Sequence, residues 1–206
     1  MSSTRAPRAR SSAVAQAQKA SKGSQTVWIV VGVIVVIGLA AILAVALAQE
    51  DTSSASGPQV AEVTVSGELP ILPPDGVSQA VGMAAPEVTG TALGGGEMSI
   101  TNDGTPRIIG FFTHWCPACR AEVPVVSSWY NDGGAPDDVE IVAVSTGVNP
   151  QGVNYPPSRW FDREDWAIPT MLDSSVSEVA NAFGLSAYPY WVAVDAEGKV
   201  VDQLTG

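Results

Sequence analysis

The sequence predicts an α/β domain preceded by a single N-terminal transmembrane helix, and three observations lead to this fold class. The uncharged run Val27 to Ala48 comes first. From about residue 81 onward, short apolar runs alternate with helical patterns, which is the order of elements in an α/β domain. Between one such run and the next helical pattern stands a Cys-x-x-Cys element, Cys116 to Cys119. Because the chain has 2 cysteines in all, any thiol chemistry of this protein depends on this element.

The charges of the chain are distributed unevenly. The 206 residues carry a formal net charge of -11, and all 21 Asp and Glu residues lie after residue 48. Basic residues, in contrast, are the only charged residues before the uncharged run. A strongly acidic domain argues against nucleic acid or an anionic lipid surface as its partner.

The run Val27 to Ala48 is long enough to cross a membrane once, since as a helix it measures about 33 Å against about 30 Å of hydrocarbon. Basic residues precede it, and Glu50 and Asp51 follow it. This distribution places the N-terminus in the cytoplasm and the domain outside, with the helix as a signal-anchor. The alternative is a cleaved signal peptide, because Ala46-Leu47-Ala48 has an A-x-A pattern, although signal h-regions are shorter. Either way, the cysteines face an oxidising compartment.

The segments that flank the uncharged run lack the pattern of a packed core. Residues 1–26 are basic and rich in Ser and Ala, so we expect a disordered cytoplasmic segment. Residues 49–80 contain many Pro, Gly and Ser residues and are predicted to be a linker, with a short strand around Val63 as the alternative. The folded domain is therefore expected to span residues 81–206.

The domain is expected to begin with a hairpin of residues 87–93 and 97–100, because the three glycines between them supply positive φ. A buried strand at 107–113 and a helix after Cys116 follow, and Cys119 and Val123 start the apolar face of that helix. The remaining predicted elements are a parallel strand at 139–145, a helix at 158–166 capped by Ser158, a strand end at 169–173, a helix at 175–183, and strands at 190–195 and 199–204.

The Cys-x-x-Cys element is suited to disulfide exchange. Pro117 occupies the first turn of the predicted helix, where a missing N–H costs nothing. Both cysteines therefore lie at a helix N-terminus, whose unpaired N–H groups and positive dipole favour a thiolate. The thiolate is the species that attacks a disulfide. Cys116, the outer residue, is the predicted nucleophile.

Other uses of the two cysteines fit the sequence less well. A permanent structural bridge over so short a loop would stabilise the fold by only roughly 2 kcal/mol, against nearly 5 kcal/mol for a 100-residue loop. A closed zinc site needs four ligands, whereas the chain offers 2 Cys and 1 His. Covalent haem attachment needs histidine directly after the second cysteine, where Arg120 stands. We therefore expect redox exchange without a metal or other cofactor.

Several motifs resemble a known family. Trp115-Cys116-Pro117-Ala118-Cys119 after a strand, Pro124 within the next helix and Tyr188-Pro189 before a later strand resemble the thioredoxin fold. The run from Cys116 to Pro124, the membrane anchor and Ala85-Pro86-Glu87 are similar to TlpA/ResA-like membrane-anchored thiol-disulfide oxidoreductases of this fold. The resemblance covers about residues 81–206. It implies a thioredoxin-like fold, a central mixed sheet flanked by helices.

The resemblance also implies roles for the matching residues. Cys116 attacks the substrate and Cys119 resolves the mixed disulfide. Pro189 is expected in cis opposite the pair, where the backbone of Tyr188 pairs with an extended substrate strand. The side chain of Trp115 is expected to serve as packing and as a platform for the substrate.

The expected proton acceptor lies on the helix. Gly110 stands where cytoplasmic thioredoxins carry a buried Asp, so Glu122, as in the ResA-like branch, is expected to accept the proton of Cys119. His114, the only histidine, either assists proton exchange at Cys116 or points to solvent at the end of its strand.

The predicted function is that of a membrane-tethered extracytoplasmic thiol-disulfide oxidoreductase acting on secreted proteins or apocytochrome c. Its partners would be thiol or disulfide substrate proteins and a membrane redox partner that recycles the pair. A thioredoxin-like binding or chaperone module with a permanently oxidised pair is the alternative. Pro117 is similar to the residue in oxidising members of this family, and Glu122 is similar to the residue in reducing members. Whether this protein oxidises or reduces its substrates therefore stays open. The chain ends at Gly206, directly after the last predicted strand, where this fold normally adds a helix.

Overall fold

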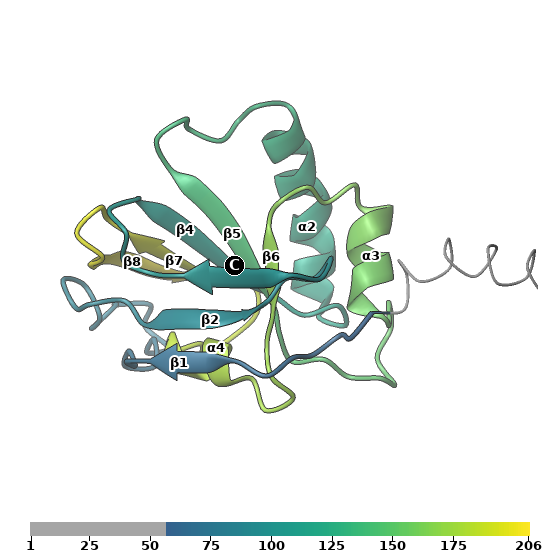
Figure 1. The fold of residues 1–206 in the computed structure, drawn as a ribbon, viewed down its shortest axis with the longest axis horizontal. Helices are drawn as coiled ribbons and strands as arrows, with labels where there is room; N and C mark the ends of the chain where they lie inside the picture. Colours follow the sequence, from purple (N-terminus) through teal and green to yellow (C-terminus); the bar gives the residue numbers. More distant parts are fainter. Residues whose placement is uncertain (1–56) are drawn as a thin grey trace, which may run out of the picture. The chain divides into compact units, whose positions relative to one another are not determined.

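The computed structural model describes residues 57–206 (Figure 1). The predicted cytoplasmic segment 1–26 and the predicted transmembrane helix 27–48 lie outside these residues. Within 57–206, no helix is both long enough and apolar enough to cross a membrane.

The centre of the domain is a five-stranded mixed sheet. Its strands are β4 (Arg107–Phe112), β5 (Glu140–Ser145), β6 (Thr170–Leu172), β7 (Tyr190–Val194) and β8 (Val200–Thr205). They lie in the order β6-β5-β4-β7-β8. β4, β5 and β6 run parallel, whereas β7 is antiparallel to β4 and β8 to β7. The predicted buried strands and their parallel arrangement are confirmed, because β4 and β5 pair in parallel and, after a charged first residue in each, consist mostly of buried apolar residues.

Helices cover both faces of this sheet (Figure 1). They are α2 (Pro117–Asn131), α3 (Pro157–Arg163) and α4 (Glu178–Ala182). α2 and α3 share one apolar core with Phe112, whereas α4 belongs to a second core with Phe111. Neighbouring residues of a strand point to opposite faces, so these two phenylalanines enter different cores. Cys119 and Val123 are buried on the inner face of α2, as predicted.

A second, antiparallel sheet contributes to the core on the α4 side. Its strands are β1 (Thr64–Ser66), β2 (Glu87–Thr91) and β3 (Glu97–Ile100), in the order β1-β2-β3. β2 and β3 form the hairpin that the glycines predict. β1 is the short strand considered for this segment, and it lies next to α4 (Figure 1).

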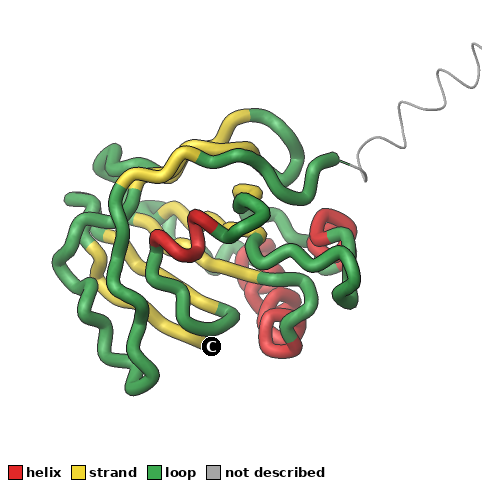
Figure 2. Tube along the Cα trace, turned by 90° about the horizontal axis from the view of Figure 1, so that it is seen from below, coloured by secondary structure: helices red, strands yellow, loops and turns green. Residues whose placement is uncertain are grey.

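The folded domain starts earlier than the predicted residue 81. β1 pairs with β2, and Leu69 and Leu72 are buried in the core on the α4 side. Figure 2 shows this part of the chain as loop and short strand along the outside of the domain. Residues 64–80 therefore belong to the domain and not to the predicted linker 49–80. Their many Pro and Gly residues reflect an extended, packed segment.

α3 begins one residue before its predicted start. Pro157 occupies the first helical turn and Pro156 is the N-cap residue. Ser158 therefore lies inside the helix, and its hydroxyl makes no capping hydrogen bond. The predicted Ser158 cap is wrong because proline suits the first turn, where a backbone N–H has no partner to lose.

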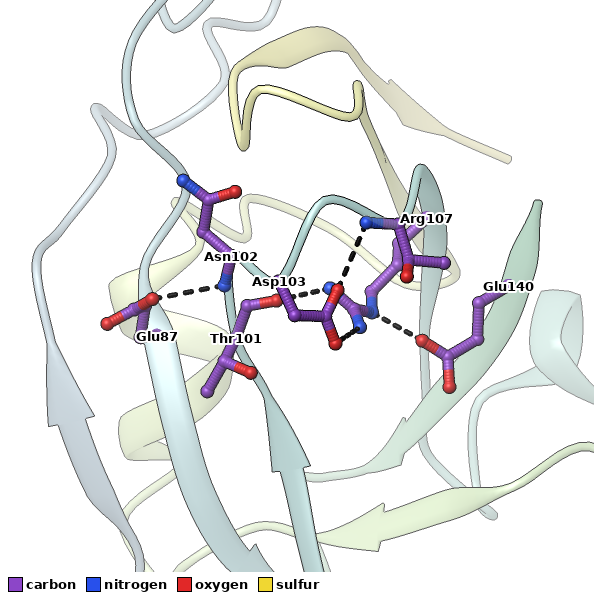
Figure 3. A network of polar contacts seen from close by, with 7 residues as sticks. Glu87, Thr101, Asn102, Asp103, Arg107 and Glu140 are labelled. Carbon is purple, nitrogen blue, oxygen red and sulfur yellow. Dashed lines mark hydrogen bonds and ion pairs between the residues drawn. The ribbon is translucent and has the colours of Figure 1, made fainter. Parts of the chain in front are cut away.

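A polar network lies at the start of β4, the end of the strand remote from the cysteines (Figure 3). The buried guanidinium of Arg107 donates hydrogen bonds to the Thr101 carbonyl and to the carboxylates of Asp103 and Glu140. The hydrogen bond from Arg107 is the main cause that lowers the pKa of Asp103 to about 2. Because Thr101 follows β3 and Glu140 opens β5, this network joins the two sheets and has a structural role.

Candidate active site

The two cysteines occupy different environments at the start of α2. Cys116 is the N-cap residue and is half-buried, whereas Cys119, one turn further on, is completely buried. Both are free thiols. Pro117 lies in the first turn, as predicted. The helix N-terminus therefore directs its unpaired N–H groups and its positive dipole toward Cys116.

Burial separates the reactivity of the two thiols. It is the main cause that raises the pKa of Cys119 to about 12, and the neighbouring Cys116 and the charge of Glu122 act in the same direction. At neutral pH Cys119 is therefore a protonated thiol that needs a base before it attacks. Cys116 is the more exposed of the two thiols.

The loop before β7 faces Cys116. The Tyr188–Pro189 peptide bond is cis, as the resemblance implies. The Cys116 Sγ lies 3.7 Å from the carbonyl oxygen of Tyr188, to which the thiol donates. The structure thus brings Cys116 together with Tyr188 and Pro189, two of the three residues predicted to bind substrate.

Trp115 lies at the surface next to Cys116 in the chain. Its indole N–H donates to the carbonyl of Gly147 at 2.7 Å, and its ring packs edge-on against Tyr188 with centroids 6.0 Å apart. The hydroxyl of Thr113 donates to the same carbonyl at 3.1 Å. With 37% of its surface exposed, Trp115 is a fixed apolar surface beside Cys116, and the loop that follows β5 holds it there.

His114 is buried, with only 1% of its surface exposed, so the expectation of a solvent-facing side chain is wrong. Its Nδ1–H donates to the Val153 carbonyl at 2.6 Å, and its Nε2 accepts from the Asn149 N–H at 3.2 Å. This pattern requires the neutral ring. His114 therefore ties the strand end before Cys116 to the loop that carries the Gly147 carbonyl.

We expect the stability of the domain to fall on acidification through His114. Burial lowers the pKa of His114, whereas histidine in an unfolded chain titrates near about 6.5. The unfolded chain therefore binds the proton first. The stability that neutral His114 contributes is complete above about pH 6.5 and is lost as the pH falls toward the lower folded pKa.

Urea unfolding between about pH 7.5 and 5 checks this expectation. His114→Asn keeps a side-chain N–H donor near the Val153 carbonyl but does not titrate, so its free energy of unfolding should decline less over this range. Because the chain has 1 histidine, no second imidazole contributes. Equal declines in both proteins would contradict the prediction.

Glu122 lies on α2, half-buried, on the side of the helix that faces β7. Its Oε1 accepts a hydrogen bond from Trp191 Nε1 at 2.5 Å. Its charge is near enough to act on the Cys119 thiol. Of the predicted site residues, Glu122 thus lies three residues after Cys119 on α2, and its polar partner comes from the sheet.

Sequence reasoning missed two residues of this site. Trp191 was not expected to contact Glu122, and the Gly147 carbonyl was not expected to hold Trp115. The signal for Trp191 is its position two residues after Pro189, on a strand next to the one that carries Gly110. The Gly147 contact involves a main-chain atom, for which the side-chain pattern gives no signal.

Comparisons with known proteins agree with this geometry. The Redoxin family matches residues 80–206 of this chain. The chain is 28% identical over 106 residues to the sporulation thiol-disulfide oxidoreductase A of Bacillus subtilis, covering 52% of this chain and 62% of that protein, less than two thirds of its length. It is 30% identical over 128 residues to the thiol-disulfide oxidoreductase ResA of Geobacillus thermodenitrificans, covering 62% of this chain and 70% of that protein.

A solved structure shows the same fold. The thioredoxin domain of a thiol-disulfide oxidoreductase from Bacteroides vulgatus is 26% identical and superposes with a TM-score of 0.52, covering 63% of this chain and 91% of that domain. The family match extends over more than half of the chain and includes both cysteines. The chain therefore belongs to the Redoxin family, as a protein of thioredoxin-like fold that is similar to the ResA-type thiol-disulfide oxidoreductases.

Proposed function

We propose that this chain is a membrane-tethered, extracytoplasmic thiol-disulfide oxidoreductase that exchanges disulfides with secreted proteins or with apocytochrome c. The observation that carries the proposal is the asymmetry of the pair, with Cys116 half-exposed at a helix N-terminus and Cys119 buried behind it. The names of the relatives support the reaction type.

The proposed reaction moves two electrons. The Cys116 thiolate attacks one sulfur of a substrate disulfide, so that a mixed disulfide forms and the first substrate thiolate leaves. Cys119 then gives its proton to Glu122 and attacks the Cys116 sulfur, which closes the Cys116–Cys119 disulfide and releases the second substrate thiolate. The substrate is reduced and the pair is oxidised. A membrane redox partner would return the pair to the dithiol, and the same steps in reverse would oxidise a substrate.

The substrate would bind where Cys116 meets the loop of cis-Pro189. The Tyr188 carbonyl beside the thiol is a main-chain acceptor to which an extended substrate strand can donate. Trp115 offers an exposed aromatic surface for the side chains of that strand. Recognition through main-chain groups and apolar contact would suit unfolded proteins of varied sequence.

Insulin reduction and the repair of scrambled ribonuclease test the proposed activity with the full chain. We expect acceleration of at least one of these reactions. Cys116→Ser is the control, because it keeps the fold and removes the proposed nucleophile. Absence of acceleration in both assays would favour the alternative of a binding module whose cysteine pair does not cycle.

The proposed tether rests on the uncharged run Val27 to Ala48 and on the basic residues before it. A reporter that is active only in the cytoplasm, fused after Gly206, should therefore be silent in cells. A reporter of the opposite kind, active only outside the cytoplasm, should be active at the same position. The reverse pattern would overturn the topology.

Glu122→Gln is expected to slow the resolution step by about 10-fold or more, because it removes the proposed base. Whether the resolution step becomes slower or faster distinguishes a role as proton acceptor from a role through charge alone. The charge of Glu122 raises the pKa of Cys119, so a carboxylate that acted only through its charge would make resolution faster when removed. Stopped-flow measurement of resolution near neutral pH decides between them. An unchanged or faster step would rule out Glu122 as the base.

A further inference from the structure

A buried glycine of β4 and a tryptophan of β7 lie opposite each other on the α2 side of the sheet. Gly110 and Trp191 are partners in the antiparallel β4–β7 register. A Cβ atom at residue 110 would lie 2.6 Å and 2.8 Å from two carbons of the indole ring. Phe112 packs edge-on against the same indole, with centroids 5.1 Å apart. The indole therefore has its place because residue 110 has no side chain.

From this place the indole reaches the active-site helix. Its Nε1–H donates to Oε1 of Glu122 at 2.5 Å. The other carboxylate oxygen, Oε2, lies toward the end of β8, since a Cβ atom at Gly206 would be 2.6 Å from Oε2 and 2.8 Å from the ring of Pro189. Oε1 is thus held by the indole, and Oε2 lies toward Pro189 of the active-site loop.

We propose that Trp191 is a positioning residue for disulfide exchange, whose indole N–H holds the Glu122 carboxylate in place to accept the proton of Cys119. This inference rests on the proposed function and on the role proposed there for Glu122. Gly110 contributes to this arrangement because, without a side chain, it leaves room for the Trp191 indole. The sheet thus carries no acid of its own at residue 110, but orients one supplied by the helix.

The physical reason is the freedom of a half-buried glutamate. Its side chain has several rotamers, and a base contributes to proton transfer only in those that bring it within reach of the thiol. A hydrogen bond from a rigid, packed indole to the charged carboxylate favours one of these rotamers. Trp191→Phe removes the donor and keeps an aromatic ring at this position, although that ring is smaller than the indole, so a control for lost packing is needed.

A two-step reagent separates attack from resolution in the full chain. With dithiobis(nitrobenzoate), attack by Cys116 releases one coloured thiolate and forms a mixed disulfide. Attack by Cys119 releases the second thiolate and closes the Cys116–Cys119 disulfide. Trp191→Phe should leave the first release unchanged and slow the second by about 10-fold, the size expected for the loss of one charge-assisted hydrogen bond.

Trp166→Phe is the matched control. The Trp166 indole also donates a hydrogen bond, to the Thr170 hydroxyl at 2.8 Å, and also packs edge-on against Phe112, at 5.3 Å between centroids. Trp166→Phe therefore removes an indole donor from the same core, while Glu122 keeps its hydrogen bond from Trp191. This variant should resolve the mixed disulfide at the wild-type rate. Equal slowing in both tryptophan variants would mean a general packing effect and would overturn the inference.

A double-mutant cycle with Glu122→Gln tests whether Trp191 acts through Glu122. Trp191→Phe should slow resolution in the wild-type background and have no further effect when Glu122 is already Gln. Additive effects would contradict the inference, since a purely structural tryptophan would act in both backgrounds. If Glu122→Gln slows resolution and Trp191→Phe does not, the inference fails while the role of Glu122 stands. If the wild type never releases the second thiolate, the proposed function itself fails.

An NMR measurement keeps the inference testable even if Trp191→Phe does not fold. The chain has 6 tryptophans and hence as many indole N–H signals to follow. A short hydrogen bond to a carboxylate should move one of them strongly downfield, and Glu122→Gln should shift that signal while the fold is kept. No indole signal that responds to Glu122→Gln would overturn the inference.

Discussion

Replacing Cys116 by serine is expected to abolish disulfide exchange. Cys119 is completely buried and its pKa is raised to about 12, so it cannot replace Cys116 as the attacking thiolate near neutral pH. Turnover in the insulin or ribonuclease assay should therefore fall to the uncatalysed rate. Urea unfolding of the variant should match that of the wild type, because serine fits the half-buried N-cap position of α2.

Alkylation of the reduced wild-type chain is the independent check on this assignment. A small alkylating reagent at neutral pH should label Cys116 first and leave Cys119 unlabelled until the domain is denatured. Labelling of Cys119 before Cys116, or residual turnover in Cys116→Ser, would reverse the roles of the two cysteines.

Cys119→Ser is expected to convert the enzyme into a trap. Cys116 keeps its exposed position at the helix N-terminus, so the mixed disulfide with a substrate still forms. Without the second thiol, resolution has no attacking group, and the covalent complex should accumulate instead of turning over. Intact-protein mass spectrometry under non-reducing conditions should show one substrate per chain, and dithiothreitol should release it.

The double variant, Cys116→Ser with Cys119→Ser, is the control for this trap and should retain no substrate. Complexes that form equally well in the double variant would be non-covalent or would involve cysteines of the substrate alone. Rapid turnover by Cys119→Ser, without accumulation, would mean that resolution does not depend on Cys119.

The central sheet and the active-site helix were predictable because their signals are local. After Arg107, β4 is an apolar run, as is typical of a strand covered on both faces, and Pro117 marks the start of α2 within the Cys-x-x-Cys element itself. The positions of Cys116, Cys119 and Pro189 followed from motifs that are contiguous in the sequence. Predictions of this kind depend on a few neighbouring residues, and the structure agrees with them.

The segment before residue 81 was mispredicted because its contacts are with distant residues. The backbone N–H of Leu69 donates to the Ala182 carbonyl, and that of Leu72 to the Gly184 carbonyl. An extended segment held in this way needs no helical or alternating pattern. Its composition therefore resembled that of a linker.

The surroundings of His114 and Glu122 were out of reach of the sequence for the same reason. His114 bonds to residues of a loop more than thirty positions away, and the partner of Glu122 is Trp191, on another strand. A single sequence contains no measure of such distances. The contacts of these two residues thus depend on the fold and not on neighbouring residues in the sequence.

A single-turnover transfer experiment tests disulfide exchange by Cys116 and Cys119 most directly. The oxidised full chain is mixed with a reduced model protein, and the reduced chain with the oxidised form of that protein, followed by acid quenching and mass analysis at successive times. In at least one direction, we expect a transient mixed disulfide at Cys116 followed by complete transfer, much faster than with Cys116→Ser. Transfer no faster than with that variant in either direction, with both cysteines intact, would contradict the proposed function.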